Sequence, residues 1–273
     1  MLNGITIGQF FPGDSLLHRM DPRVKLILTF AYIVAVFVPQ NWVGLSVAIG
    51  FLIFSVIISR LPLRLVFKSL KPIIPLIVIT SAINIFYVDK GMLLWEWGFI
   101  RITSQGVITA SFIALRILCL IAGSSLLTYT TSPTTLTDAL ERLMKPLKVL
   151  HVNVHELAMM MTIALRFIPT LIEETDKIMS AQKARGADME SGGLMQRIKA
   201  LIPVLIPLFV SSFRRAYELA IAMECRCYRG GEGRTRMKQL HMAARDYISV
   251  AVFALMLGAV IALNFVISSV FIR

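Results

Sequence analysis

The chain has 273 residues, of which 56% are hydrophobic, and its mean hydropathy is +0.74. It is far more apolar than a soluble domain, so the composition predicts an all-α, polytopic membrane protein embedded in the lipid bilayer. The formal net charge of +12 does not indicate nucleic-acid binding, because the basic residues flank apolar runs and no aromatic stacking platform accompanies them.

Five apolar segments are long enough to be predicted transmembrane helices, at about 24–39, 43–59, 72–88, 106–131 and 247–272. Asp21 and Pro22 are residue types that typically cap and begin a helix, and they precede the first segment. No cleavable signal peptide is visible, so the first span is expected to be retained. We therefore expect an N-terminal transmembrane region of four spans (1–131), a helical region (132–245) and a C-terminal transmembrane helix (246–273).

The distribution of basic residues predicts the orientation of the spans. The loop at 40–42 has no basic residue, whereas the connection at 60–71 contains Arg60, Arg64, Lys68 and Lys71. Basic loops remain in the cytoplasm. We therefore expect a multi-pass protein of the cell membrane, with the N-terminus and region 132–245 in the cytoplasm and the C-terminus outside.

Arg116 lies within the fourth apolar segment. A charged side chain there is unfavourable unless it faces protein or a polar cavity. A structural ion pair and a role in a substrate path both remain open.

The region 132–245 contains signals for several amphipathic helices. Ser132 and Pro133 predict the start of a helix suited to the membrane surface, and Asn153 with Glu156 has capping-box spacing for a second helix, expected to end before Pro169. Further helices are expected from Pro169 to about residue 185 and from about 202 to 228, roughly 25 Å and 35–40 Å long at 1.5 Å per residue. Together they predict a cytoplasmic layer.

The last two predicted helices each end in a short arginine-containing stretch, AQKARG at 181–186 and AMECRC at 222–227. Glycine follows each arginine, as Gly186 and as Gly230 with Gly231, and glycine typically stops a helix.

Apolar side chains in the same region allow two interpretations. Met159, Met160 and Met161 are consecutive, and Leu171 and Phe209 lie on apolar helix faces. They are either ordinary core residues or an adaptable binding surface, because unbranched thioether side chains can repack against different partners.

Motifs for catalysis, cofactors and metals are missing from the sequence. It has no GxxxxGK[ST] phosphate loop, no G-x-S-x-G elbow and no HExxH pair, so no catalytic residue is expected. Cys225 and Cys227 would point about 200° apart on a helix and could not share a metal ion. The spans contain almost no acids that could carry a coupling ion. These absences favour a mechanical or coupling role and a protein that is not an enzyme.

Taken together, the two arginine stretches resemble the paired Ala-Arg-Gly motifs of energy-coupling factor transporter T components, the EcfT/CbiQ family. Their arginines are 41 residues apart, and Asp21-Pro22-Arg23, Leu165-Arg166-Phe167-Ile168-Pro169 and the single final span are also similar to the family. The second stretch differs from the usual pattern, because Cys225 and Cys227 replace alanine and glycine.

The resemblance implies an ATP-driven micronutrient importer in which this chain links two cytoplasmic ATPases to a membrane-embedded, substrate-binding S component. The implied ATPase-docking residues are Ala184, Arg185, Gly186, Cys225, Arg226 and Cys227. The candidate S-component contacts are the three methionines with Leu171 and Phe209. An ordinary ABC permease and a membrane scaffold without transport are the alternatives.

Overall fold

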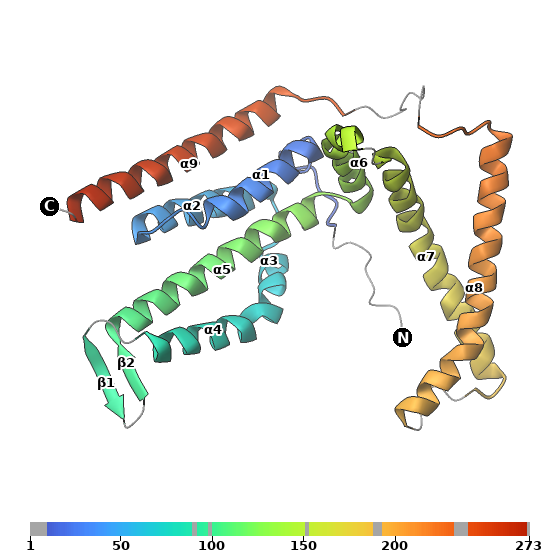
Figure 1. The fold of residues 1–273 in the computed structure, drawn as a ribbon, viewed down its shortest axis with the longest axis horizontal. Helices are drawn as coiled ribbons and strands as arrows, with labels where there is room; N and C mark the ends of the chain where they lie inside the picture. Colours follow the sequence, from blue (N-terminus) through green and yellow to red (C-terminus); the bar gives the residue numbers. More distant parts are fainter. Residues whose placement is uncertain are drawn as a thin grey trace. The chain divides into compact units, whose positions relative to one another are not determined.

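The computed structural model describes residues 10–88, 92–97, 100–150, 153–187, 193–231 and 240–271 (Figure 1). The chain forms two compact units. One contains the described residues of 8–139 and 240–273, and the other contains those of 140–239. The first unit is therefore discontinuous in sequence, because α9 returns to it after the second unit.

The first unit is a helical bundle. Its helices are α1 (Pro22–Ala35), α2 (Trp42–Ser59), α3 (Leu63–Leu70), α4 (Ile74–Tyr87), α5 (Ser104–Thr130) and α9 (Ala244–Phe271), with a short 3₁₀ turn η1 (Lys71–Ile73) between α3 and α4. Asp21 caps α1 by accepting a hydrogen bond from the Arg23 N–H, as predicted for the sequence Asp-Pro-Arg. The connection at 60–71, expected as a loop, is mostly the amphipathic helix α3.

Five helices of the described chain are long and apolar enough to span a membrane, which confirms the predicted all-α fold with about five spans. They are Trp42–Ser59, Leu63–Tyr87, Ser104–Thr130, Val154–Ala184 and Ala244–Ile267. The set differs from the expected one in two places. Helix α1 has 14 residues, or about 21 Å, and is shorter than the hydrocarbon layer of about 30 Å, whereas α7 reaches the required length.

The core of the first unit lies between α1, α2, α5 and α9. Tyr32, Leu52, Cys119, Leu126 and Val260 are among its buried side chains. The Tyr32 ring lies directly against Gly123, where a Cβ atom would overlap it, and its hydroxyl donates to the Ala48 carbonyl at 3.3 Å. Glycine at 123 thus allows α1 and α5 to approach closely.

A β-hairpin that was not predicted joins α4 to α5. Strands β1 (Leu93–Trp97) and β2 (Ile100–Thr103) pair antiparallel, with Trp97 opposite Ile100. The strands follow the third predicted span, so the predicted orientation of the spans places them outside the membrane. Thr103 then caps α5, since its hydroxyl accepts the Gly106 N–H at 3.1 Å.

The second unit is built mainly from two long helices, α7 (Val154–Ala184) and α8 (Leu194–Cys225). Helix α6 (Pro133–Met144) and the 3₁₀ segment η2 (Lys145–Leu150) precede them. Helix α6 begins at Pro133 and α7 directly after Asn153, as predicted. The Asn153 side chain contacts the Glu156 carboxylate at 3.2 Å instead of capping the backbone.

The predicted helix break before Pro169 is wrong. Helix α7 continues through Pro169, and α8 begins at residue 194 and contains Pro203 and Pro207. A proline removes one backbone donor, and flanking turns with good helix formers can outweigh that local loss. With 31 and 32 residues, the helices are about 46 and 48 Å long, much longer than the sequence suggested.

Candidate functional site

The first arginine stretch forms the C-terminal cap of α7. Arg185 is the cap residue, and Gly186 adopts a positive φ of +86°. The Ala187 N–H donates to the Gln182 carbonyl at 3.0 Å, and the Gly186 N–H donates to the Lys183 carbonyl at 3.0 Å. This pair of bonds is a Schellman motif, which satisfies carbonyls that the helix end leaves open.

The second stretch caps α8 with the same motif. Arg226 is the cap residue, the Tyr228 N–H donates to the Met223 carbonyl at 3.0 Å, and the Cys227 N–H donates to the Glu224 carbonyl at 2.8 Å. Cys227 takes the left-handed position with φ of +55°. The two arginines therefore occupy equivalent positions in two equivalent helix ends.

The residue that ends α8 differs from the prediction. Gly230 and Gly231 were expected to stop the helix, but Cys227 already leaves it. Gly230 also has a positive φ, +92°, and lies three residues later. Gly231 contacts the His155 ring, where a Cβ atom would overlap the imidazole. Instead of stopping α8, Gly231 allows the chain after α8 to pass close to the start of α7.

Both motif arginines are exposed to solvent. Within the part of the chain that the structure describes, neither guanidinium has an ion-pair or hydrogen-bond partner. Ala184, Gly186, Cys225 and Cys227 are exposed as well. Each helix end thus presents an unpaired guanidinium, whose planar donor fork suits a carboxylate or carbonyl of another molecule.

Helices α7 and α8 pack against each other in opposite directions (Figure 1). The end of α7 lies beside the first third of α8, because the Gln182 side chain donates to the Pro203 carbonyl at 3.3 Å. About two-thirds of the way along each helix, Arg215 donates to Glu174 through Nη2 at 2.7 Å and Nε at 3.1 Å, and the Ser211 hydroxyl donates to the same carboxylate. These contacts of Glu174 with Ser211 and Arg215, which were not predicted, fix how the two helices cross.

The antiparallel arrangement separates the two arginines. Pro203 marks the level of the α7 end on α8, and Arg226 lies 23 residues further along α8. At 1.5 Å per residue this distance is about 35 Å. One small pocket on a partner cannot contact both guanidinium groups.

The candidate partner-binding residues divide between exposed and partly buried positions. Met160, Met161 and Phe209 are exposed, whereas Met159 and Leu171 are partly buried. Phe209 belongs to an apolar face that runs along α8, whose exposed members are Ile198, Ile202, Leu205, Ile206, Phe209, Val210, Phe213 and Tyr217. Among the side chains of α8 that the structure describes, Val204 is the buried hydrophobic one. Most of the apolar surface of α8 is therefore not covered by the described chain.

Arg116 in α5 binds neutral groups. Its Nη2 donates to the Pro39 carbonyl at 2.8 Å, and its guanidinium lies over the rings of Phe37 and Phe112 at 5.6 and 4.9 Å from their centroids. No carboxylate pairs with it among the described residues. It anchors the turn between α1 and α2, a structural role without the ion pair that was considered.

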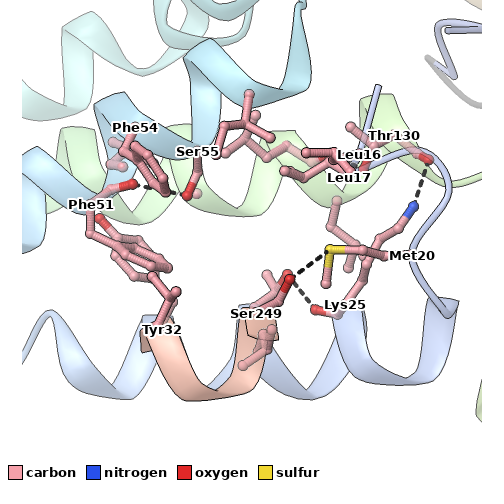
Figure 2. Close-up of a pocket in the computed structure, with 18 of the residues that line it drawn as sticks. Leu16, Leu17, Met20, Lys25, Tyr32, Phe51, Phe54, Ser55, Thr130 and Ser249 are labelled. Carbon is pink, nitrogen blue, oxygen red and sulfur yellow. Dashed lines mark hydrogen bonds between the residues drawn. The ribbon is translucent and has the colours of Figure 1, made fainter. Parts of the chain in front are cut away.

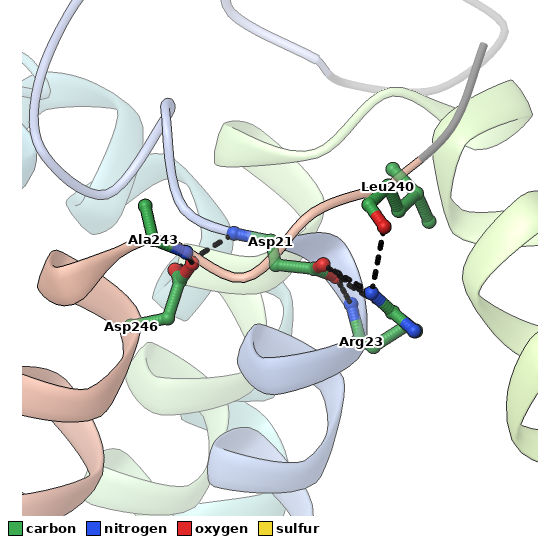
Figure 3. A network of polar contacts seen from close by, with 5 residues as sticks. All are labelled: Asp21, Arg23, Leu240, Ala243 and Asp246. Atoms are coloured by element: carbon green, nitrogen blue, oxygen red, sulfur yellow. Dashed lines mark hydrogen bonds and ion pairs between the residues drawn. The ribbon is translucent and has the colours of Figure 1, made fainter.

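A polar network explains the Asp-Pro-Arg sequence at the start of α1 (Figure 3). Asp246, 1% exposed, accepts the backbone N–H groups of Asp21 at 2.9 Å and Ala243 at 2.8 Å. Arg23 binds the Asp21 carboxylate at 2.7 Å and donates to the Leu240 carbonyl at 3.2 Å. These contacts fix the point at which the chain re-enters the first unit. Nothing in the sequence linked Asp246 to a residue 225 positions earlier.

Comparisons with known proteins agree with these features. A family model described as "Cobalt transport protein" (CbiQ) matches residues 13–237. The "Energy-coupling factor transporter transmembrane protein EcfT" of Clostridium kluyveri is 54% identical over 250 residues, covering 91% of this chain and 93% of the relative. The proteins of the same name from Ruminiclostridium cellulolyticum and Bacillus subtilis are 52% and 46% identical, covering 97% and 96% of this chain and 99% and 98% of the relatives.

Proposed function

Because the chain belongs to the EcfT/CbiQ family of transporter membrane components, we propose that it couples ATP hydrolysis to the movement of a separate substrate-binding S component. Two cytoplasmic ATPase subunits supply the energy, and the transported substrate is a micronutrient such as a vitamin or a metal ion. The chain itself performs no catalysis. Its work is mechanical, since it transmits the motion of the ATPases to the S component.

The observation that carries this proposal is the equivalence of Arg185 and Arg226. Each is the exposed cap residue of a Schellman motif at the end of a long helix, and about 35 Å of helix separates them. Matched contacts at that separation suit two copies of similar ATPases, one at each arginine. An arginine remains charged at every physiological pH, so the contact transmits force without pH dependence.

The proposed orientation places the N-terminus and the α7–α8 pair in the cytoplasm. Helix α7 is long enough to span a membrane, but its C-terminal half carries Glu173, Glu174, Asp176 and Lys177. Those charges, and the ion pair between Glu174 and Arg215, favour a surface layer over the bilayer core. We therefore keep α7 in the coupling region at 132–245, between transmembrane regions 1–131 and 246–273.

The exposed face of α8 and the methionines of α7 are the proposed surface for the S component. A soluble helix rarely leaves a continuous row of large apolar side chains uncovered, and such a surface marks a protein or membrane contact. Methionine side chains at 159–161 can repack against partners of different shape. This adaptability would allow one coupling chain to serve several S components.

Copurification with the ATPases tests the proposal. Arg185→Ala and Arg226→Ala should each reduce ATPase association, because removing one partner of a desolvated charge pair typically costs about 2–5 kcal/mol, or about 30-fold or more in affinity. The lysine variants keep the charge but not the planar fork and should be intermediate. The double alanine variant should lose nearly all ATPase association and substrate uptake while still inserting in the membrane.

Arg214→Ala is the matched control, since Arg214 is an exposed arginine of α8 that lies far from either helix end. It should bind the ATPases as the wild type does. Wild-type association and uptake in the double variant would remove the two arginines from the mechanism. Normal ATPase binding by the wild-type chain without any uptake would instead favour a membrane scaffold.

A further inference from the structure

A cavity of about 280 Å³ opens into the first unit between α1, α2, α5 and α9 (Figure 2). Its walls are almost entirely apolar, with side chains such as Leu28, Tyr32, Phe51, Leu126 and Val252. Pockets for drug-sized ligands are about 300–1,000 Å³, so this one suits a single flexible chain. The coupling role described above does not use it.

One end of the cavity carries positive charge. Lys25 and Arg245 both line it there, close to the starts of α1 and α9. Lys25 is 7% exposed, and its ammonium donates to the Thr130 carbonyl at 2.9 Å, the Thr131 hydroxyl at 3.2 Å and the His18 carbonyl at 3.4 Å. Its three donors are therefore occupied by neutral oxygens.

The neighbouring charges leave Arg245 as the group available to a ligand. Asp246 partly offsets the charge of Lys25, and Asp21 pairs with Arg23. Arg245 is exposed and has no ion-pair partner within the described part of the chain. This end of the cavity thus keeps a net positive charge and a guanidinium with free donors.

The depth of the cavity matches part of one lipid leaflet. Lining residues extend from Lys25 to Tyr32 on α1 and from Arg245 to Val252 on α9, and the end residues are seven positions apart in each case. Seven residues of helix correspond to about 10 Å, and one leaflet contributes about 15 Å of hydrocarbon. Phe54 and Ile248 at the rim are exposed on α2 and α9, two helices that are candidate spans. The opening therefore faces lipid.

We propose that this cavity binds an anionic phospholipid, with one acyl chain between α1, α2, α5 and α9 and the phosphate on Arg245. Lys25 contributes its charge at close range, and Arg245 contributes the hydrogen bonds. The chain fills apolar space that protein side chains leave open, and the phosphate neutralises the excess charge at the entrance. In the proposed topology the site lies in the cytoplasmic leaflet, where anionic lipids are common.

Native mass spectrometry of the full-length chain tests this assignment. The purified protein is released from micelles that contain equal amounts of phosphatidylglycerol and phosphatidylcholine. We expect one retained phosphatidylglycerol per chain in the wild type. Arg245→Glu should lower its retention relative to phosphatidylcholine about five- to tenfold, because it reverses the charge at the phosphate. Arg64→Glu is the matched control, since Arg64 is exposed on α3 and does not line the cavity.

Filling the cavity tests the acyl chain independently of charge. Ser55→Phe and Ser249→Leu place added volume inside the walls and should abolish retention of both lipids. Two separate variants are used so that one remains informative if the other fails to fold, which circular dichroism would reveal. Equal retention of the two lipids, or an equal effect of Arg64→Glu, would overturn the proposal. So would cavity-filled variants that keep their lipid but lose a protein partner, because a protein would then be the occupant.

Discussion

Cys227 occupies a backbone position that normally favours glycine. Its φ of +55° lies in the left-handed region, as does the φ of +86° at Gly186 in the equivalent motif. A non-glycine residue there is strained by roughly 1–2 kcal/mol, because Cβ approaches the following carbonyl oxygen. The departure of the second motif from the usual Ala-Arg-Gly pattern therefore has a local energetic consequence.

Replacing Cys227 by glycine should stabilise the end of α8. Relief of about 1–2 kcal/mol of strain exceeds the extra chain entropy of glycine, about 0.5–1 kcal/mol. Hydrogen–deuterium exchange of the last turn of α8 should slow about two- to fivefold. Cys225→Gly, at the last helical residue of α8, should speed the same exchange, because glycine there raises the chain entropy of the unfolded state without relieving any strain. Shifts of the same sign in both variants would contradict the strain argument.

At the level of single residues, the sequence located the two candidate docking arginines better than the backbone geometry around them. Arg185 and Arg226 were placed at helix ends, and the structure puts both at C-terminal caps. The left-handed position of Cys227 was missed, because cysteine carries no signal for a positive φ. The Asp21–Asp246 contact was missed because a single sequence does not show which distant residues meet.

At the level of helices, hydrophobic periodicity and capping signals predicted where α6 and α7 begin. They failed where proline competes with helix formation in long segments. Pro169 in α7, and Pro203 and Pro207 in α8, all lie inside continuous helices. The hairpin β1–β2 was also missed, because strands of five and four residues are too short for their alternation of polar and apolar residues to stand out. These errors shortened the predicted coupling helices but did not change the fold class.

The exposed face of α8 should be a partner surface separable from the helix ends. Phe209→Ser and Phe213→Ser remove two large side chains that are 61% and 72% exposed, so they should leave the fold of the chain nearly unchanged. We expect copurification of the S component to fall while ATPase association stays within about twofold of the wild type. Val204→Ser is the contrasting control, because Val204 is buried and its replacement should weaken both associations. Parallel loss of both partners in the phenylalanine variants would show misfolding and not a specific surface.

At the scale of the whole molecule, the apolar segments of the sequence and the lengths of the observed helices give the same number of spans but not the same set. Helix α1 has 14 residues and α7 has 31. Length and composition cannot separate a long surface helix with one apolar half from a true span. The positions of the charges separate the two cases. The basic residues at 60–71 and the acidic residues in the C-terminal half of α7 are unfavourable inside hydrocarbon, so these segments are expected outside the bilayer core.

The native cysteines allow the proposed orientation to be tested directly. Cys225 and Cys227 are exposed at the end of α8, whereas Cys119 is buried in α5. If 132–245 is cytoplasmic, a membrane-impermeant maleimide should label the chain, expressed without its ATPases, only after the cells are permeabilised. Tyr87 is 85% exposed at the end of α4, on the side predicted to be outside. Tyr87→Cys, in a chain with Cys225→Ser and Cys227→Ser, should therefore be labelled on intact cells.

The two labelling experiments give opposite results for the two orientations. An inverted chain would expose Cys225 and Cys227 to the reagent on intact cells and would hide a cysteine at position 87. The helix ends of α7 and α8 would then face away from any cytoplasmic ATPase, and coupling through Arg185 and Arg226 would be physically impossible. The proposed arginine contacts therefore depend on the orientation of the first unit in the membrane. The cavity of the phospholipid site exists in either orientation, because it is formed by the first unit alone, but an inverted chain would place it in the outer leaflet.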